Sequence, residues 1–278
     1  MHFVMTSPSG PAQAQDYCVI WHGDALLLPE SGLPRIGQLP LTGLRHLGEL
    51  AGQRCFVGEW VGPLPAGWRS LSLRQALAGQ APADWAGLLS RARMLRTFDR
   101  THRYCSACAT PLRDHDHDHG KVCPSCGLLS YPKLSPAMMA LVVRDRQLLL
   151  ARSPHFPPGV YSALAGFVEP GETLEACVHR EVQEEVGVRI HNLRYLGSQG
   201  WPFPHSLMLA FVADYLDGEI TPQAGEIESA QWFDLDQLPA LPSQASIAHS
   251  LIHRAVAMLN GQPLADDAAG LRYARAAP

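Results

Sequence analysis

The chain has 278 residues, enough for a full core and more than one structural unit, and with 46% apolar and 17% charged residues its composition is typical of a soluble protein. Its formal net charge of −4 excludes the overall basic field that holds long nucleic acids. No apolar run approaches the length of a membrane span, and Met1–Gly10 lacks the basic and apolar segments of a secretory signal, so we expect neither.

The seven cysteines indicate the redox compartment. An odd number of cysteines without a secretory signal argues against a disulfide framework. We therefore expect a reducing, cytoplasmic setting.

Residues 1–100 show short apolar runs between breaks rich in glycine and proline, for example Val19–Trp21 and Ala25–Leu28. Leu71–Ala78 is typical of a short helix, and 83–99 has the apolar spacing of an amphipathic helix. We expect a small α+β domain. One face of the second helix carries four arginines, for which we expect a solvated surface rather than a phosphate-binding patch: Arg91, Arg93, Arg96 and Arg100.

Two C-x-x-C units follow, Cys105/Cys108 and Cys123/Cys126, separated by fourteen residues. This spacing is typical of a tetrahedral Cys₄ zinc site, which has no open position and is structural. We expect a zinc ribbon over residues 101–133 that holds one Zn²⁺ per chain. A redox pair is the alternative, but no thioredoxin-like context surrounds either unit. A ribbon can also bind nucleic acid, but without a basic cluster we favour a scaffold.

Between the two units lies an alternating tract, Asp114–His119, followed by Gly120. Alternating Asp and His is a pattern of metal-binding tracts. We favour instead the exposed tip of the ribbon hairpin, because Gly120 ends the tract as a turn would.

From residue 134 the pattern changes to apolar, strand-like runs around two helical segments. One helix is expected within Thr173–Val186 and a closing helix at Ser246–Leu259. The expected strands are Ala137–Val143, Leu148–Ala151, Tyr161–Val168, Leu193–Ser198, Leu207–Tyr215 and Ala230–Phe233. Strands around two helices predict an α/β/α sandwich with a mixed sheet over residues 134–265, followed by a frayed tail, 266–278.

The helix after Pro170-Gly171 carries carboxylates on its apolar face. Leu174, Val178 and later valines recur every four residues, and Gly187 should end the helix. At about 100° per residue, Glu181 and Glu185 share the stripe of those apolar residues, and Glu184 lies beside them. Burying ionised carboxylates is costly without compensation. Arg180 can neutralise one of them, and the rest favour Mg²⁺ or Mn²⁺ over the alternative, a solvated acidic face.

The segment Ser198–Ser206 places Trp201 and Phe203 between prolines. Two aromatic rings held by prolines form a stiff surface on which bases stack. Alternatively, both rings anchor the loop on the core.

The stretch Gly166–Val188 resembles the Nudix box, the signature of a family that hydrolyses nucleoside diphosphates linked to another group. A zinc ribbon, then this box, then Ser198–Ser206 is similar to the NADH pyrophosphatase branch of that family. The resemblance covers roughly residues 101–260. The branch commonly has proline where this chain has Gly200, which loosens the aromatic loop.

The resemblance implies roles for single residues. The catalytic metal would be held by the Ala165 carbonyl and by Glu181, Glu184, Glu185 and Glu226, with Glu228 a competing candidate. Either Glu184 or Glu185 would be the base, and Arg180 would orient the glutamates. The implied substrate contacts are Arg74, Asp118, Tyr131, Gln199, Gly200, Trp201, Pro202, Phe203, Pro204, His205, Ser206 and Ala248. The family's homodimer would bring Arg74 and Asp118 to a neighbouring subunit.

The implied activity is metal-dependent hydrolysis of NADH or NAD⁺ to AMP and the nicotinamide mononucleotide. The same cleavage would remove an NAD cap from RNA. A broader Nudix hydrolase, acting on ADP-ribose, dinucleoside polyphosphates or oxidised nucleotides, is the alternative within the class. A non-catalytic nucleotide-binding or zinc-ribbon module is the alternative outside it.

Overall fold

A computed structural model describes residues 3–7, 10–30 and 32–262 of the chain. The predicted tail 266–278, and the last residues of the predicted domain 134–265, lie outside these ranges. The described residues form two compact units, which we treat separately. The first contains residues up to Lys133 together with the loop Pro202–His205, and the second contains Leu134–Trp201 and the residues from Ser206 on.

The first unit begins with a six-stranded sheet in the order β1-β4-β5-β2-β3-β6. Its strands are β1 (Phe3–Val4), β2 (Tyr17–His22), β3 (Ala25–Pro29), β4 (Thr42–Leu50), β5 (Gln53–Glu59) and β6 (Trp68–Ser72). Strands β2 and β5 are parallel and the other neighbours antiparallel. The predicted strands correspond to β2 and β3. The sequence did not reveal β4, because Gly43 and Gly48 interrupt it and its register shifts twice against β5.

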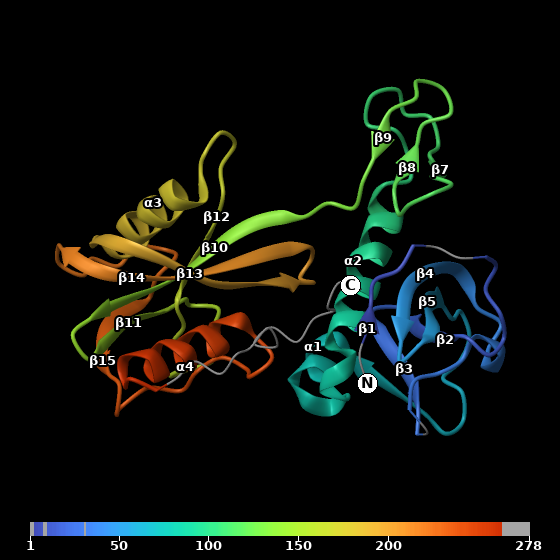
Figure 1. Ribbon diagram of the computed structural model, residues 1–278. Helices are drawn as coiled ribbons and strands as arrows, with labels where there is room; N and C mark the ends of the chain where they lie inside the picture. Colours follow the sequence, from blue (N-terminus) through green and yellow to red (C-terminus); the bar gives the residue numbers. More distant parts are fainter. Residues whose placement is uncertain (1–2, 8–9, 31, 263–278) are drawn as a thin grey trace. The chain divides into compact units, whose positions relative to one another are not determined.

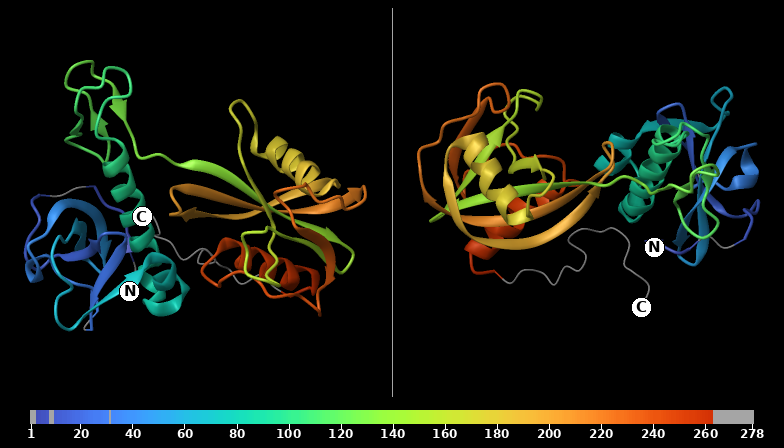
Figure 2. Two further views of the ribbon diagram at one scale, coloured as in Figure 1. Left: turned by 180° about the vertical axis from the view of Figure 1, so that it is seen from behind. Right: turned by 90° about the horizontal axis from the view of Figure 1, so that it is seen from above.

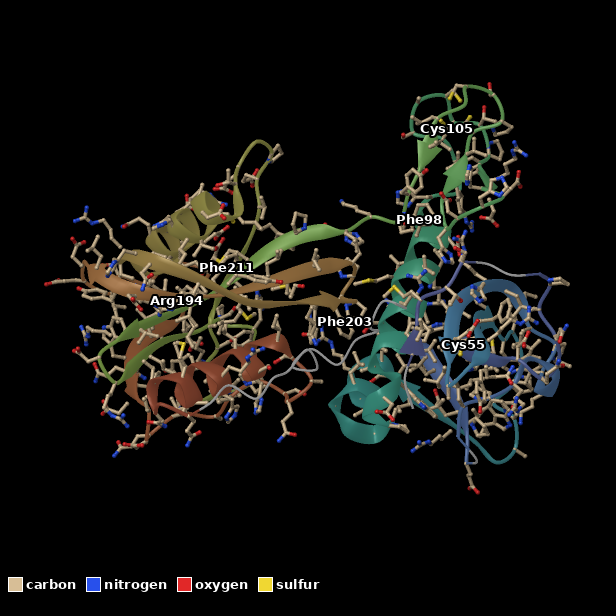
Figure 3. All side chains as sticks on the ribbon, in the orientation of Figure 1. Cys55, Phe98, Cys105, Arg194, Phe203 and Phe211 are labelled. Atoms are coloured by element: carbon tan, nitrogen blue, oxygen red, sulfur yellow. The ribbon has the colours of Figure 1, made fainter. Side chains whose placement is uncertain are left out.

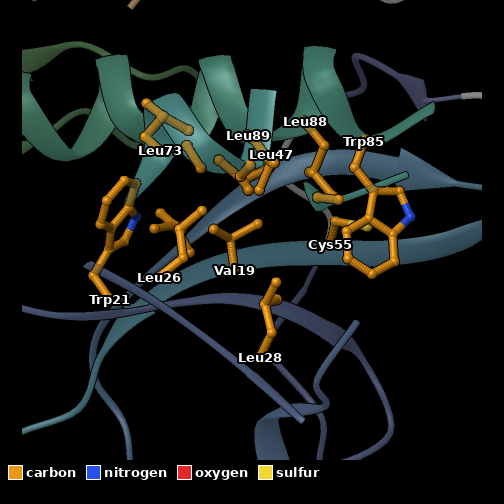
Figure 4. Packing of buried hydrophobic residues seen from close by; sticks show 14 of the residues in the cluster. Val19, Trp21, Leu26, Leu28, Leu47, Cys55, Leu73, Trp85, Leu88 and Leu89 are labelled. Atoms are coloured by element: carbon orange, nitrogen blue, oxygen red, sulfur yellow. The ribbon is translucent and has the colours of Figure 1, made fainter. Parts of the chain in front are cut away.

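Helical segments cover one face of this sheet. On this face lie α1 (Leu73–Gln75), which continues as a π-helical turn, η2 (Ala76–Gln80), then the short turn η3 (Ala83–Trp85) and α2 (Ala86–Thr101). The short turn η1 (Ile36–Gln38) lies on the opposite face, where Ile36 packs with Cys18 and Ile20. Leu88 and Leu89 of α2 pack on Val19 and Leu26 of the sheet (Figure 4). The predicted helix at 83–99 is confirmed, with a short 3₁₀ turn at its start. The predicted helix at Leu71–Ala78 is confirmed only from Leu73 on, because Leu71 and Ser72 belong to β6.

The predicted solvated arginine face of α2 is wrong for Arg96, which is only 6% exposed. Its guanidinium lies 4.9 Å from the Trp21 ring centroid, and its Nε donates to Glu59 at 2.8 Å. Buried guanidinium groups need such partners, because desolvation otherwise outweighs packing. The sheet residues that supply them are far away in sequence, so periodicity gave no sign of the pairing.

The first unit also contains the small three-stranded sheet β7 (Arg113–Asp114), β8 (Lys121–Val122) and β9 (Leu129–Ser130). The tract between β7 and β8 is the tip of a hairpin, closed by a hydrogen bond from the His115 N–H to the Gly120 carbonyl of 3.0 Å. The interpretation of Asp114–Gly120 as a hairpin tip is thereby confirmed.

The second unit is built on a curled mixed sheet in the order β13-β14-β10-β11-β15, with β12 added beside β10. Its strands are β10 (Ser135–Arg144), β11 (Gln147–Arg152), β12 (Leu164–Phe167), β13 (Arg189–Trp201), β14 (Ser206–Asp217) and β15 (Ser229–Asp234). Only the β10–β14 pair is parallel. All six predicted strands are present, although Tyr161–Ala163 precede β12 rather than belong to it.

Two helices cover opposite faces of this sheet, α3 (Leu174–Val186) and α4 (Ile247–Leu259) (Figures 1 and 2). Val178 and Val182 of α3 pack in one core, and Leu251 and Ile252 of α4 pack in a separate core on the other face. The predicted α/β/α sandwich is confirmed. Within the described ranges, no helix is both long and apolar enough to span a membrane.

Candidate functional site

Helix α3 presents its carboxylates inward, as its periodicity predicts. Thr173 caps it by accepting a hydrogen bond from the Ala176 N–H, and Gly187 ends it at φ 76°. Glu185 is 7% exposed and the Glu181 side chain 13%, whereas the Glu184 side chain is 51% exposed. The predicted burial of the first two carboxylates is confirmed.

Strand β12 leaves room for the Glu181 carboxylate only because residue 166 is glycine. A Cβ on Gly166 would lie 1.9–2.2 Å from the carboxylate carbon and oxygens of Glu181. No side chain fits at that distance, so the backbone of β12 forms one wall of the carboxylate's position.

Arg180 holds three carboxylates together. Its guanidinium forms two hydrogen bonds to Glu172, of 2.8 and 2.9 Å. It also bonds Glu181 at 2.9 Å and Glu184 at 3.0 Å. Sequence reasoning expected Arg180 to neutralise one of these glutamates but missed Glu172, whose pKa the Arg180 hydrogen bonds lower to about 2. The position of Glu172, in the turn directly before the helix cap Thr173, is the sequence feature that could have predicted this contact.

Glu185 is in an unusual electrostatic position. Burial, followed by the charges of Glu181 and Glu226, raises the pKa of the Glu185 carboxyl to about 8. A hydrogen bond from the Ala165 backbone opposes this shift. Oε2 of Glu185 is buried and has no hydrogen-bond partner among the described residues. A buried acceptor of this kind is costly, so the site favours a positive charge beside it.

A cavity of about 290 Å³ opens beside Glu185, and Ala165 and Glu226 also line it. The end of α3 positions Glu226: the Gln223 N–H donates to the Glu185 carbonyl at 2.9 Å, and Glu226 follows in the next turn. Glu228 instead pairs with Arg152 at 2.9 Å. Of the two competing glutamates, Glu226 is therefore the one whose charge acts on Glu185.

These groups suit a divalent cation. The N–H and C=O of one strand residue point to the same side, so the Ala165 carbonyl faces the region of Glu185. The glutamate oxygens are nevertheless spread out: within the described ranges, only the four ribbon cysteines bring three or more possible ligand atoms within 4.8 Å of one another. Mutual repulsion and the pull of Arg180 on Glu181 account for the spread, and a bound cation would reverse it.

The predicted nucleotide loop is tied to α4 through Gln199, which is 5% exposed. Its amide donates to the Ala245 carbonyl at 3.0 Å and accepts from the Ile247 N–H at 2.7 Å. Gln199 thus caps the helix that carries Ala248, which is itself buried. Trp201 and Ser206 pair at the end of the β13–β14 hairpin, next to Gly200.

The remaining predicted substrate contacts belong to the first unit. There, the guanidinium of Arg74 lies 4.2 Å from the ring centroid of Phe203, the residue labelled in Figure 3. Phe203 also packs against the buried core of that unit. Tyr131 is 54% exposed, and both its ring and the Asp118 carboxylate lie against Gly120. Arg74 thus lies beside Phe203, and Tyr131 lies beside Asp118.

The four ribbon cysteines converge as expected. Pairs of Sγ atoms lie 3.5–3.7 Å apart, for example Cys108 and Cys123 at 3.5 Å. Tetrahedral zinc with Zn–S of about 2.3 Å places its sulfurs about 3.8 Å apart. The two knuckles repeat one backbone pattern: Cys105 N–H bonds the Thr110 carbonyl at 2.8 Å, and Cys123 N–H bonds that of Leu128 at 2.9 Å. Figure 3 labels Cys105 in the ribbon. The cysteines form a structural zinc site.

Comparison with known proteins agrees with this geometry. The family described as NUDIX domain matches residues 133–255, and the one described as NADH pyrophosphatase zinc ribbon domain matches residues 100–131. The chain belongs to the Nudix hydrolase family, in the branch that carries this ribbon.

The NAD-capped RNA hydrolase NudC of Chromobacterium violaceum is 54% identical over 260 residues, 92% of this chain and 97% of that protein. The enzyme of the same name from Stutzerimonas stutzeri is 49% identical and covers 86% of both chains. Among solved structures, a NUDIX hydrolase from Nitrosomonas europaea matches with a TM-score of 0.49 and 24% identity, over 58% of this chain and 94% of that one.

Proposed function

We propose that this chain hydrolyses the diphosphate of NADH and NAD⁺, giving AMP and nicotinamide mononucleotide, and that it removes NAD caps from RNA by the same cleavage. Water adds to one phosphorus, and the bond from that phosphorus to the bridging oxygen breaks. The likeness to proteins named NAD-capped RNA hydrolase supports the substrate, and the carboxylates beside the cavity support the chemistry.

The observation that carries the proposal is the Glu185 carboxylate, buried with one partnerless oxygen at a cavity that Glu226 also lines. A divalent ion bound at this position would polarise phosphoryl oxygens and acidify a bound water. Glu181, Glu185, Glu226 and the Ala165 carbonyl would hold it.

Arg180 fixes the directions of Glu181 and Glu184, since one nitrogen of its guanidinium bonds both. Glu184 or Glu185 takes the proton of the attacking water, and Glu184 has the more exposed carboxylate. Gln199–Ser206, with Ala248, would receive the nucleotide. The family resemblance assigns further substrate contacts to Tyr131 and, in a neighbouring subunit, to Arg74 and Asp118.

Two matched variants test the assignment. Glu226→Gln and Glu228→Gln make the same chemical change two residues apart, but only Glu226 acts on the Glu185 charge. We expect Glu226→Gln to lower kcat/KM for NADH by at least about a hundredfold, because it removes a metal ligand worth several kcal/mol. Glu228→Gln should stay close to wild type. The reverse order would transfer the ligand role to Glu228.

A substrate panel separates this proposal from the broader alternative, since the carboxylate cluster alone does not distinguish the two ends of a diphosphate. Purified protein is incubated with NADH, NAD⁺, ADP-ribose and NAD-capped RNA, and the products are resolved. Preference for the nicotinamide substrates supports the proposal, and equal turnover of ADP-ribose supports a broader hydrolase. A protein inactive on all four with Mg²⁺ and with Mn²⁺ would be a binding module.

The same proposal includes a homodimer, Mg²⁺ or Mn²⁺ as the catalytic ion, and a cytoplasmic location. The family resemblance supports the first two. The third is supported by the seven cysteines, none of which forms a disulfide. Light scattering of the purified protein tests the dimer, and turnover with each metal alone tests the ion.

A further inference from the structure

Helix α4 carries two histidines that the proposed reaction does not use, His249 and His253. They are four residues apart, so they occupy the same side of the helix on successive turns. The buried face of α4 is formed by Ile247, Ala248, Leu251, Ile252 and Ala255. His253 is exposed and His249 partly so, and an ion can therefore reach both rings from solvent.

The two rings converge on their Nε2 atoms. The two Nε2 atoms are hydrogen-bonded at 3.0 Å, so one of the two rings carries the shared proton, and the ring centroids are 4.2 Å apart. Two imidazole nitrogens that bind one metal at right angles, each at about 2.1 Å, lie about 3.0 Å apart. A tetrahedral ion would need a separation of about 3.4 Å. The observed distance therefore matches neighbouring ligands of a square or octahedral ion without rearrangement of the helix.

We propose that His249 and His253 bind a late first-row divalent transition ion through their Nε2 atoms, with water completing its coordination. Imidazole suits Ni²⁺, Cu²⁺ and Zn²⁺, and right-angled geometry favours the first two. Two histidines on successive turns of a helix are a recurring way of presenting nitrogen ligands to a metal.

The histidine pair is held in place before any ion binds. The His249 N–H donates to Ser246 Oγ at 3.3 Å, which caps the helix, and Gln199 accepts from the Ile247 N–H. The buried face fixes the rotation of α4 against the sheet. These contacts fix the backbone positions of both histidines, and the hydrogen bond between the rings holds their Nε2 atoms side by side.

The protonation state also suits a metal. Burial, and then the neighbouring His253, lowers the pKa of His249. The neutral form of the His249 ring is therefore favoured, and a bound metal ion would replace the proton that the two Nε2 atoms share.

The test uses the full chain, with zinc in its ribbon and Mg²⁺ in excess at the carboxylates, titrated with Ni²⁺ in a calorimeter. We expect one Ni²⁺ per chain at this site in the wild type. His249→Ala and His253→Ala should each weaken this binding by at least about tenfold, because a ligand is lost. His191→Ala, which removes an exposed histidine of β13, is the matched control and should bind as the wild type does.

Two further measurements separate this site from the others. Zinc content should be unchanged in all variants, and Glu185→Gln should retain the Ni²⁺ site. The Cu²⁺ electron paramagnetic resonance spectrum of the wild type should show two coupled nitrogens, and either His→Ala variant should lose at least one. Equal Ni²⁺ binding by wild type and both variants, with unchanged thermal unfolding, would overturn the proposal.

Discussion

Replacing Gly166 by alanine should inactivate the enzyme while leaving it folded. The added Cβ would overlap the Glu181 carboxylate at 1.9–2.2 Å, and ordinary contact begins at 3.4 Å, so the carboxylate must retreat by more than about 1 Å. The carboxylate is the mobile end of a long side chain and can move. The φ of Gly166 is not in the left-handed region, so alanine is tolerated there. Alanine also restricts the unfolded chain, which favours folding by about 0.4–1 kcal/mol.

The expected loss of activity follows from the displacement. A misplacement of about 1 Å in a catalytic group costs about a hundredfold in rate, or about 2.7 kcal/mol of barrier. Two quantities are measured for the variant and the wild type: kcat/KM for NADH and the midpoint of thermal unfolding. We expect about a hundredfold loss of the former and a midpoint within a few degrees of wild type.

A double variant tests whether Gly166 acts through Glu181. Glu181→Gln keeps the size of the side chain but removes its charge and should itself be strongly impaired. Adding Gly166→Ala to it should cost little more, because the same interaction is already lost. The reasoning is refuted if Gly166→Ala retains activity within about threefold of wild type, or if the two losses multiply in the double variant.

Three further predictions concern the ribbon, its hairpin tip and the capping glutamine. Metal analysis should find about one zinc per chain, retained under mild magnesium chelation; Cys108→Ser should release it and lower the unfolding midpoint, whereas Ser125→Ala, beside a ligand, should do neither. Burial, then the charges of Arg91 and Arg45, lowers the pKa of His119 from 6.5 to about 4. The unfolded chain therefore binds the proton more readily, so this contribution to stability is complete above pH 6.5 and is lost as pH falls toward 4. Thermal unfolding of His119→Gln should depend less on pH over this range, and an unchanged slope would contradict the assignment. Gln199→Ala should reduce the free energy of unfolding by about 1–3 kcal/mol, because it leaves the Ala245 carbonyl and the Ile247 N–H unpaired. Urea denaturation measures this, and a loss below about 0.5 kcal/mol would show that water replaces the amide.

The helix and strand pattern of the second unit was readable because its signals are local. Thr173 caps the start of α3, Gly187 ends it, and the apolar periodicity between them defines its buried face. All three signals lie within or directly beside the helix. The C-x-x-C spacing likewise predicted the convergence of four sulfurs. In the first unit, strand β4 was not predicted, because glycines and register shifts break its apolar alternation. The burial of Arg96 was not predicted either, because its partners come from strands distant in sequence.

By itself the sequence determined the candidates for the chemistry: the glutamates that share the apolar stripe of one helix, the arginine directly before the first of them and the four zinc ligands. Only the tertiary structure decided how they are used. The fold ties Glu172 to Arg180, assigns Glu228 to Arg152 and brings Glu226 to the cavity of Glu185. The spacing of residues along one helix fixes which of them share a face. Which carboxylate stays without a partner depends on contacts between segments far apart in the chain, and these form only when the sheet and its loops pack.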